Sequence, residues 1–467
     1  MAQQGDGQRE HWSGTLGFVL AAVGSAVGLG NVWKFPYEAG TNGGGAFVVV
    51  YLGCIAFLGL PMLVTEMVIG RRSEKGPVGA FLALAPEERG GRSWGGWGFF
   101  AILTGFLLLS FYSVVGGWTV GYVFKAISGE FAAAPVAEIP DMFGGLSGDP
   151  VWATIYHGLF MAATIGVVYG GVSDGIERAT KIMMPTFGVL LLGMLVYSLT
   201  LSGAGEALSF LFAPDFSQIT PQVVLDAMGQ GFFTLSLGMG AMIVYGSYLN
   251  SDDSIIGSAI YVAIFNTLVA IMAGVVIFGV VFSKEGVEPG SGPSLVFETM
   301  PQLLAGLTGG YVLTIAFFVL LGFAALTSSI SLLEVVVSYF VDELEIDRPK
   351  VALGMGTLIF VAGVPSVLSF SLLSDVTVSV GGGEKTIFGL LNYLVSNWAL
   401  SLGGLGAALY AGWAVDPQEW FDEMTGPESG VDESSADWFR LVVTGWLWMI
   451  RIVAPIGIFA ILYNSVR

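Results

Sequence analysis

The chain of 467 residues is 54% hydrophobic and only 11% charged, with a mean hydropathy of +0.77. Soluble domains carry about 25% charged residues, so this composition excludes a large soluble domain and indicates an integral membrane protein. The formal net charge of −19 excludes nucleic acid as a partner. A single cysteine, Cys54, excludes an internal disulfide, and two histidines, His11 and His157, are too few and too far apart for a histidine-based metal site.

Apolar segments long enough to cross a ~30 Å hydrocarbon core recur along the whole chain. Two further apolar stretches, 207–212 and 294–304, are too short to cross, and we expect them to form helices in loops. The pattern therefore predicts an all-α membrane protein with about eleven transmembrane helices, at about 14–39, 44–70, 97–127, 151–171, 178–201, 222–248, 255–283, 308–341, 351–373, 386–414 and 440–464.

Lysine and arginine indicate the orientation, because cytoplasmic loops are enriched in them. With the N-terminus in the cytoplasm, most loop cations fall inside, and only Lys125, Lys284, Lys385 and Arg467 fall outside. An odd number of spans then places the C-terminus on the other side. The sequence predicts a multi-pass protein of the cell membrane, surrounded by lipid, with a cytoplasmic N-terminus and an extracellular C-terminus.

The first predicted span is interrupted by GSAVGLGNVWKFP, from Gly24 to Pro36. Glycine lowers helical preference by roughly 1 kcal/mol relative to alanine, and proline breaks a helix. We therefore expect the helix to break near its middle, where freed carbonyls can coordinate a cation. Closely spaced glycines also let membrane helices pack tightly, so this stretch alone leaves both interpretations open.

A second interrupted stretch, QGFFTLSLGMGAM at 230–242, lies in the sixth span. Its Gly238 and Gly240 correspond to Gly28 and Gly30 of the first span. Such a pair, in matching positions of two five-span halves, is typical of inverted-repeat transporters with a mid-membrane binding site. The eighth span adds the hydroxyls of LTSSIS (326–331), which either bond back to their own helix or supply neutral oxygens to a hard cation.

These motifs resemble those of the neurotransmitter:sodium symporter family. GSAVGLGN is followed by KFP, where the family has RFP, and then by NGGGAF, SFYSVVGGW, QGFFTLSLG and FAALTSSIS. The resemblance runs from REHW (9–12) to the tenth span and implies the leucine-transporter fold, a five-plus-five inverted repeat with broken first and sixth helices. Its implied parts are a cytoplasmic N-terminal segment (1–13), the first repeat (14–201), an extracellular loop (202–221), the second repeat (222–414), an acidic cytoplasmic loop (415–439) and an eleventh span (440–467).

The resemblance also implies two sodium sites and a substrate pocket. The first sodium site would comprise Ala26, Asn31, Thr234 and Asn266, completed by the substrate carboxylate. The second would comprise the carbonyls of Gly24, Val27 and Ala324 with the hydroxyls of Thr327 and Ser328. In the pocket, Gly30 and Tyr112 would hold the carboxylate and Phe233 would form the lid, although apolar members alone are typical of any membrane-protein interior. The pocket would comprise Ser25, Leu29, Gly30, Leu108, Tyr112, Phe233, Ser236, Met239 and Leu332.

Gates follow from the same resemblance. The inner gate would pair Arg9 with Asp342, braced by Trp12 and Tyr248. At the outer gate the family pairs an arginine with an aspartate, and this chain has Lys34 and Asn392 instead. A Lys–Asn contact is weaker than an Arg–Asp fork, so we expect Phe233 to be the main outer barrier.

Three acidic or helix-breaking positions complete the predictions. Glu38 lies four residues after Lys34, a spacing that lets the two pair on one helix face. Glu66 lies in mid-span, where we favour a structural bond to backbone freed by the breaks over proton coupling. In the fifth span, Gly175 and Pro185 match a family pattern associated with local unwinding on the inward-opening side.

The implied function is sodium-coupled import of a neutral hydrophobic or aromatic L-amino acid by alternating access. Amine-carrying relatives place an aspartate where this chain has Gly28, so the substrate must bring its own carboxylate. A small neutral amino acid or another carboxylate-bearing solute is the alternative. An ion channel is disfavoured because the polar groups form one sealed patch, and an enzyme because no catalytic constellation is present.

Chloride is left open beside the two expected sodium ions. Chloride-dependent relatives have a serine one turn beyond the Asn266 position, and independent ones usually have an acid. This chain has Ala270 there, which supplies no negative charge. The sequence only slightly favours independence of chloride.

Overall fold

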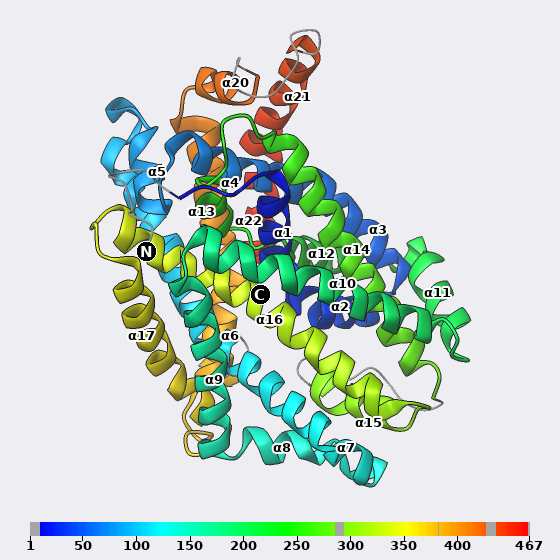
Figure 1. Ribbon diagram of the computed structural model, residues 1–467. Coiled ribbons are helices and arrows are strands. Elements are labelled where there is room, and N and C mark those ends of the chain that lie inside the picture. The colour runs from blue at the N-terminus through cyan, green and yellow to red at the C-terminus, as the bar shows by residue number, and fades with distance from the viewer. Residues whose placement is uncertain (1–9, 285–293, 382, 426–435, 466–467) are drawn as a thin grey trace.

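The computed structural model describes residues 10–284, 294–381, 383–425 and 436–465, and almost all of them are helical (Figure 1). Within these ranges, nine helical segments are long and apolar enough to cross a membrane. They are Gly45–Ser73 (α3 Gly45–Cys54, η2 Ile55–Gly59, α4 Leu60–Ser73), Gly91–Ser128 (η4 Gly91–Trp94, α6 Gly95–Ser128), Pro150–Tyr169 (α9), Val172–Ser198 (η6 Val172–Glu177, α10 Arg178–Ser198), Ile255–Val281 (α14), Gly310–Asp342 (α16), Arg348–Leu368 (α17), Ile387–Ala414 (α18 Ile387–Tyr393, η9 Leu394–Ala399, α19 Leu400–Leu409, η10 Tyr410–Ala414) and Trp438–Asn464 (α21 Ala436–Trp448, η12 Met449–Val453, α22 Ala454–Asn464).

The first span is broken, as the sequence predicts. Helix α1 (Thr15–Ala26) ends at the glycine-rich stretch, and a π-helical turn, η1 (Gly30–Lys34), leads into α2 (Phe35–Thr41). The two halves are bent by 51° and together form a tenth candidate span. The break leaves residues 27–29 outside either helical half, where their backbone groups face the protein interior.

The sixth predicted span is broken too, and this accounts for the difference between ten candidates and eleven predicted spans. Helices α12 (Pro221–Thr234) and α13 (Ala241–Gly246) are each too short to cross alone. The backbone between them takes positive φ at Ser236 (56°), Gly238 (82°) and Gly240 (76°). Positive φ is readily adopted only by glycine, which explains the glycines of this stretch.

Short elements join the spans, and both predicted loop helices are present. The stretch at 207–212 forms α11, and the stretch at 294–304 forms η8 and α15. The remaining loop elements outside the spans are also short. The loop helices are α5 (Pro77–Ala83), η3 (Glu87–Arg89), α7 (Glu130–Ala133), η5 (Val136–Glu138), α8 (Asp141–Ser147), α11 (Ala204–Phe212), η7 (Phe216–Gln218), η8 (Leu295–Thr299), α15 (Met300–Ala305) and α20 (Pro417–Thr425).

One detail corrects the all-α prediction. A short antiparallel hairpin joins β1 (Thr377–Val380) to β2 (Gly383–Thr386), with Thr377 opposite Thr386. It lies between α17 and α18, in the loop that precedes the tenth predicted span. The hairpin adds no membrane-crossing element, so the membrane fold is helical as predicted.

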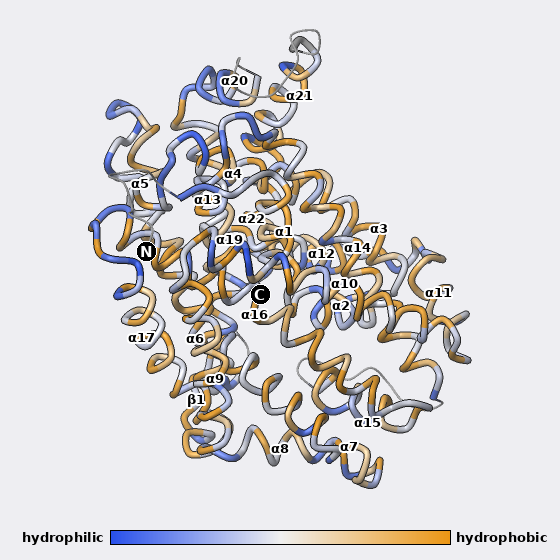
Figure 2. Tube along the Cα trace, in the orientation of Figure 1, coloured by the Kyte–Doolittle hydropathy of each residue, from blue (hydrophilic) through white to orange (hydrophobic). Residues whose placement is uncertain are grey.

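The broken helices are enclosed by the long ones. Helix α6 packs along α16, α9 and α17, and α13 packs against α4. Figure 2 shows hydrophilic segments gathered toward the end that carries α20 and α21, with hydrophobic helices between that end and the end of α7 and α8. Outward-facing side chains of α10 such as Val189, Leu192 and Val196 are exposed, as expected for a surface that faces lipid.

The break in the sixth span fits directly against α19. A Cβ atom built on Gly238 would collide with the carbonyl oxygen of Leu400, and one on Gly403 would collide with the carbonyl of Gly238. Backbone therefore packs on backbone here, and neither glycine can be enlarged without moving a helix.

We predict that Gly238→Ala lowers the melting temperature of the purified protein by several degrees, because a left-handed backbone with a Cβ costs roughly 1–2 kcal/mol even without the collision. Gly229→Ala, on α12, is the matched control. Its added Cβ would meet nothing within 4 Å. Equal melting temperatures for the two variants would contradict this account of the break.

Candidate functional site

A cluster of polar groups lies at the point where both breaks meet α14. The Asn31 amide nitrogen donates to Asn266 Oδ1 at 2.7 Å and to the Asn266 carbonyl at 2.9 Å. The Asn31 side-chain oxygen accepts from the backbone nitrogen of Gly28 at 3.1 Å, and Thr234 Oγ1 lies 3.2 Å from Asn266 Oδ1. Asn31, Thr234 and Asn266 are all buried, and these residues, which were predicted for the first sodium site, come together from three separate elements.

Oxygen atoms are unusually concentrated in this cluster. Asn266 Oδ1 lies 3.1 Å from the carbonyl oxygens of Thr234 and Ala26. Exchanging the oxygen and nitrogen of the Asn266 amide would place its nitrogen 2.7 Å from the Asn31 amide nitrogen. Two donors would then face each other, so the Asn266 oxygen is the atom that accepts from Asn31. Neutral carbonyl, amide and hydroxyl oxygens from unwound helices are the ligands that transporters offer to sodium, and this donor set fits that ion.

The second predicted sodium site is brought together in part. Thr327 Oγ1 contacts the carbonyl of Ala324 at 3.1 Å and that of Val27 at 3.5 Å, so it links α16 to the first break. Gly24 packs on the same threonine, because a Cβ on Gly24 would lie 3.4 Å from Thr327 Cβ. Ser328 donates instead to the carbonyl of Ser25 at 3.1 Å.

The predicted substrate residues surround one small cavity of about 30 Å³ between the breaks, α6 and α16. Three hydroxyl contacts tie its walls together: Ser25 to Ser331 at 2.8 Å, Ser236 to the Ser25 carbonyl at 2.9 Å, and Ser328 to the same carbonyl. The sequence missed one wall, Leu400 of α19, whose apolar surroundings carry no motif. The lining residues are Ser25, Ala26, Gly28, Leu29, Gly30, Leu108, Tyr112, Phe233, Thr234, Ser236, Met239, Ser328, Leu332 and Leu400.

Close packing explains the two glycines of the first break. A Cβ on Gly28 would lie 2.5 Å from Ser328 Oγ and 3.3 Å from the Tyr112 hydroxyl, and one on Gly30 would lie 2.9 Å from the Phe233 ring. The Tyr112 hydroxyl is buried and has no hydrogen-bond partner among the described residues. A side-chain carboxylate at position 28 would therefore have to displace Ser328, while the Tyr112 hydroxyl at the cavity wall remains available as a donor.

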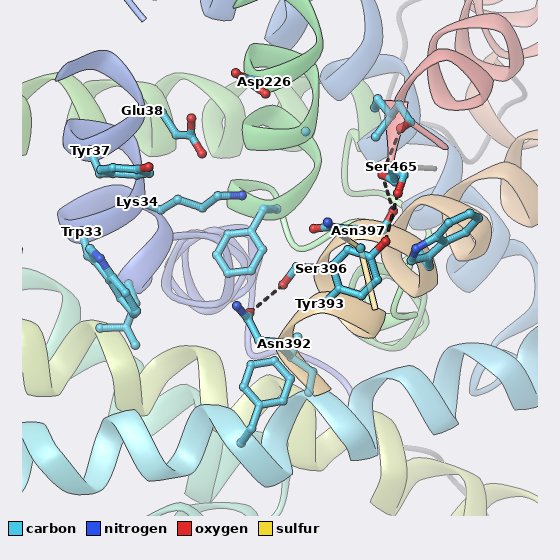
Figure 3. Close-up of a pocket in the computed structure, with 18 of the residues that line it drawn as sticks. Trp33, Lys34, Tyr37, Glu38, Asp226, Asn392, Tyr393, Ser396, Asn397 and Ser465 are labelled. Carbon is cyan, nitrogen blue, oxygen red and sulfur yellow. Dashed lines mark hydrogen bonds between the residues drawn. The ribbon is translucent and has the colours of Figure 1, made fainter. Parts of the chain in front are cut away.

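A wider pocket of about 810 Å³ opens beyond Phe233, which lines both cavities (Figure 3). Figure 3 shows Lys34, Glu38 and Asp226 on one side of this pocket and Asn392, Tyr393 and Ser396 on the other. The wider pocket therefore extends as far as Phe233.

The predicted Lys34–Glu38 ion pair does not form in the described structure. The Lys34 ammonium lies 4.8 Å from the centre of the Phe233 ring, in cation–π contact. The two residues keep the one-turn spacing of α2, but Glu38 accepts from the Asn42 side chain at 3.2 Å while Lys34 extends over Phe233, so each side chain has another partner. Asn392 accepts from Ser396 at 3.0 Å, a contact within its own helical segment.

We predict that Phe233→Ala reduces transport far more than Lys34→Gln or Asn392→Ala, because Phe233 lines both cavities while Lys34 and Asn392 line only the wider one. Uptake is compared for the three variants at matched surface expression. The opposite order would show that the polar pair is the real gate and that our assignment of Asn392 is wrong.

At the opposite end, the predicted inner gate lies only partly within the described residues, since Arg9 lies outside them. Trp12 donates from its indole nitrogen to the Tyr245 carbonyl at 3.0 Å and from its backbone to the Tyr248 carbonyl at 3.1 Å. Its ring meets Tyr248 edge-on at 6.0 Å. Asp342 ends α16 nearby.

Sequence reasoning missed an ion pair beside this gate. Arg348 contacts both carboxylate oxygens of the fully buried Glu334 at 2.7 and 2.8 Å, and the Tyr248 hydroxyl donates to Glu334 at 2.7 Å. The signal was available, because a carboxylate inside the apolar run SLLEVVV is a functional position by default.

Glu66 and the fifth span agree with their expected structural features. Glu66 is buried, and its Oε1 accepts from the backbone nitrogen of Gly238 at 2.6 Å, in the sixth-span break. The fifth span begins with the π-helical η6, which contains Gly175, and carries Pro185 inside α10. The sixth-span break and η6 are both segments in which the backbone departs from α-helical geometry.

Comparison with known proteins shows the family. The sequence pattern of the Sodium:neurotransmitter symporter family matches residues 9–138 and 146–466, and the chain belongs to this family. It is therefore a sodium-dependent transporter and not an enzyme. The comparisons leave open which solute it carries.

Three relatives place it in the prokaryotic branch. An uncharacterized sodium-dependent transporter of Bacillus subtilis, YhdH, is 37% identical over 97% of both chains. One from Haemophilus influenzae is 33% identical over 98% of both. The crystal structure of MhsT in complex with L-phenylalanine matches with a TM-score of 0.87 and 44% identity, over 98% of this chain and 100% of that one. This match establishes the leucine-transporter fold for the chain.

Proposed function

We propose that the protein imports a neutral hydrophobic or aromatic L-amino acid, driven by two sodium ions and alternating access. The N-terminus lies in the cytoplasm and the C-terminus outside in this proposal. The similarity to MhsT, whose structure holds L-phenylalanine, supports the substrate class. The pocket of about 810 Å³ and the packed opposite end correspond to an outward-open state.

The observation that carries the proposal is the crowded position of Gly28. A Cβ there would lie 2.5 Å from Ser328 Oγ and 3.3 Å from the Tyr112 hydroxyl, so a carboxylate side chain would have to displace Ser328. The neighbouring oxygen cluster is built from neutral groups, so a sodium ion held by Ala26, Asn31, Thr234 and Asn266 needs a negative partner. An α-carboxylate of the substrate, next to Gly30 and Tyr112, supplies that charge and couples the two binding events.

Selectivity for the side chain follows from the rest of the cavity. Leu108, Met239 and Leu332 are buried and apolar, and Phe233 closes one side. None of the described residues that line this cavity carries a charged side chain. A charged substrate side chain would therefore lose its hydration without gaining a partner.

The driving force is sufficient for accumulation. One sodium ion crossing 100 mV releases about 2.3 kcal/mol, and a tenfold concentration gradient adds about 1.4 kcal/mol. Two ions thus supply about 7 kcal/mol, which at the limit supports a roughly 10⁵-fold gradient of a zwitterion.

A second candidate substrate is a small neutral amino acid or another small carboxylate-bearing solute. The small cavity volume of about 30 Å³ favours it, because a small substrate requires less movement of the walls. A larger substrate requires movement of flexible walls, and Met239 and Phe233 are the side chains that can move. A comparison of the twenty amino acids as ligands separates the two candidates.

We predict that sodium-dependent thermal stabilisation, measured for the twenty amino acids, is largest for leucine, methionine, phenylalanine or tryptophan. Potassium replaces sodium in the control series. Glycine or alanine as the best ligand would favour the second candidate. Lysine, glutamate or a decarboxylated amine as the best ligand would contradict the proposed site.

We also predict that Thr327→Ala and Asn31→Ala each weaken the apparent sodium affinity by about five- to a hundred-fold, because each removes one coordinating oxygen (about 1–3 kcal/mol). Thr327→Ser keeps the hydroxyl and is the matched control. Uptake that continues undiminished when potassium replaces sodium would show that sodium coupling is wrong.

A further inference from the structure

The segment that precedes α1 is fastened to the start of the fifth span by one carboxylate. Glu177 Oε2 accepts from the Ser13 backbone nitrogen at 2.9 Å, and Oε1 contacts both the Ser13 hydroxyl and the Lys181 ammonium, the latter at 2.5 Å. Lys181 also donates to the Ser13 hydroxyl at 3.1 Å. The Glu177 side chain is only 2% exposed, so these contacts supply almost all of its partners.

Helix α1 is shaped to receive this carboxylate. A Cβ on Gly17 would lie 2.6 Å from Glu177 Cδ and closer still to Oε1, so any residue other than glycine would displace the group. A second carboxylate acts at the other end of η6, because Glu10 accepts from the backbone nitrogen of Val172 at 2.5 Å. The π-helical turn η6 is thus tied at both ends to the chain before and within α1.

The same face of α10 leads to the residues predicted for the second sodium site. Met184 follows Glu177 by seven residues, two helical turns, and lies on the same face. Its sulfur would be 3.3 Å from a Cβ on Gly24, the glycine that packs on Thr327. Separation of α1 from α10 at Glu177 would therefore open a path toward Gly24 and Thr327.

We propose that Glu177 is a positioning residue that holds α1 against η6 and so keeps the inner side of the transporter closed. The proposal rests on the alternating access argued above. A carboxylate with its donors withdrawn is costly to keep buried, so α1 and η6 can separate only if water replaces the contacts of Ser13 and Lys181 with Glu177. Opening toward the α20 end then requires Ser13 and Lys181 to leave Glu177.

Two cysteine reporters in a Cys54→Ser background test this. Met184→Cys reports opening between α1 and α10, and Ser396→Cys reports the wide pocket on the other side. A membrane-impermeant thiol reagent is applied to the purified protein in sodium-free buffer. With Glu177→Gln we expect the modification rate at position 184 to rise at least about fivefold while that at 396 falls.

Reciprocal change is the decisive readout, because general loosening of the structure would raise both rates. Gly17→Ala acts from the other helix and should reproduce the effect of Glu177→Gln. Lys125→Met breaks a surface pair with Glu130 (2.6 Å) and should leave both rates unchanged. If Glu177→Gln is poorly folded, Ser13→Ala removes a single hydroxyl and should move both rates in the same directions.

Unchanged rates in Glu177→Gln and Gly17→Ala, or a rise at both positions, would overturn the proposed role of Glu177. Sodium-dependent uptake by the wild-type protein is measured after the same preparation has been reconstituted into lipid vesicles. If the wild type transports and the variants show unaltered modification rates, this inference alone is rejected. A wild type without sodium-dependent uptake rejects the proposed function instead.

Discussion

The whole site depends on how an apolar interior pairs the backbone groups that broken helices release. An unpaired backbone group in hydrocarbon costs several kcal/mol, so each break requires partners from other spans. Glu66 accepts from Gly238, the Asn31 side chain accepts from Gly28, and Gln230 donates to the Gly30 carbonyl at 2.8 Å. The Glu66 bond ties the sixth-span break to α4, the Asn31 bond lies within the first break, and the Gln230 bond joins the sixth span to the first.

Holding the breaks together also creates the binding chemistry. The oxygens of Ala26, Thr234 and Asn266 are neutral, and Asn266 Oδ1 lies 3.1 Å from the carbonyl oxygens of the other two. Gly28 has no side chain and so adds no charge, and a Cβ there would lie 2.5 Å from Ser328 Oγ. A cation there and a carboxylate in the neighbouring cavity need each other, which is the physical basis for coupling in our proposal. The opposite end carries contacts of a different kind, the ion pairs of Glu177 with Lys181 and of Glu334 with Arg348.

The sequence predicted the features that are local in the chain. Span positions follow from apolar length, and the breaks follow from Gly28, Gly30, Gly238 and Gly240, because helix preference depends on neighbouring residues. It did not predict the contacts of Glu177 with Ser13 or of Glu334 with Arg348 and Tyr248, since these depend on which helices become neighbours. The Lys34–Glu38 pair was wrong for a similar reason: Lys34 lies over the Phe233 ring of another span and Glu38 accepts from Asn42, and the sequence spacing of 34 and 38 does not reveal these competing partners.

The central claim is that the substrate carboxylate completes the sodium site at Asn31. Linkage requires that each ligand then tighten the other by the same factor. Sodium titrations of the purified protein with and without L-phenylalanine measure that factor directly, in the wild type, Asn31→Ala and Thr327→Ala. We expect phenylalanine to tighten sodium binding in the wild type and in Thr327→Ala, and the effect to be lost in Asn31→Ala. Equal tightening in all three proteins would contradict the account.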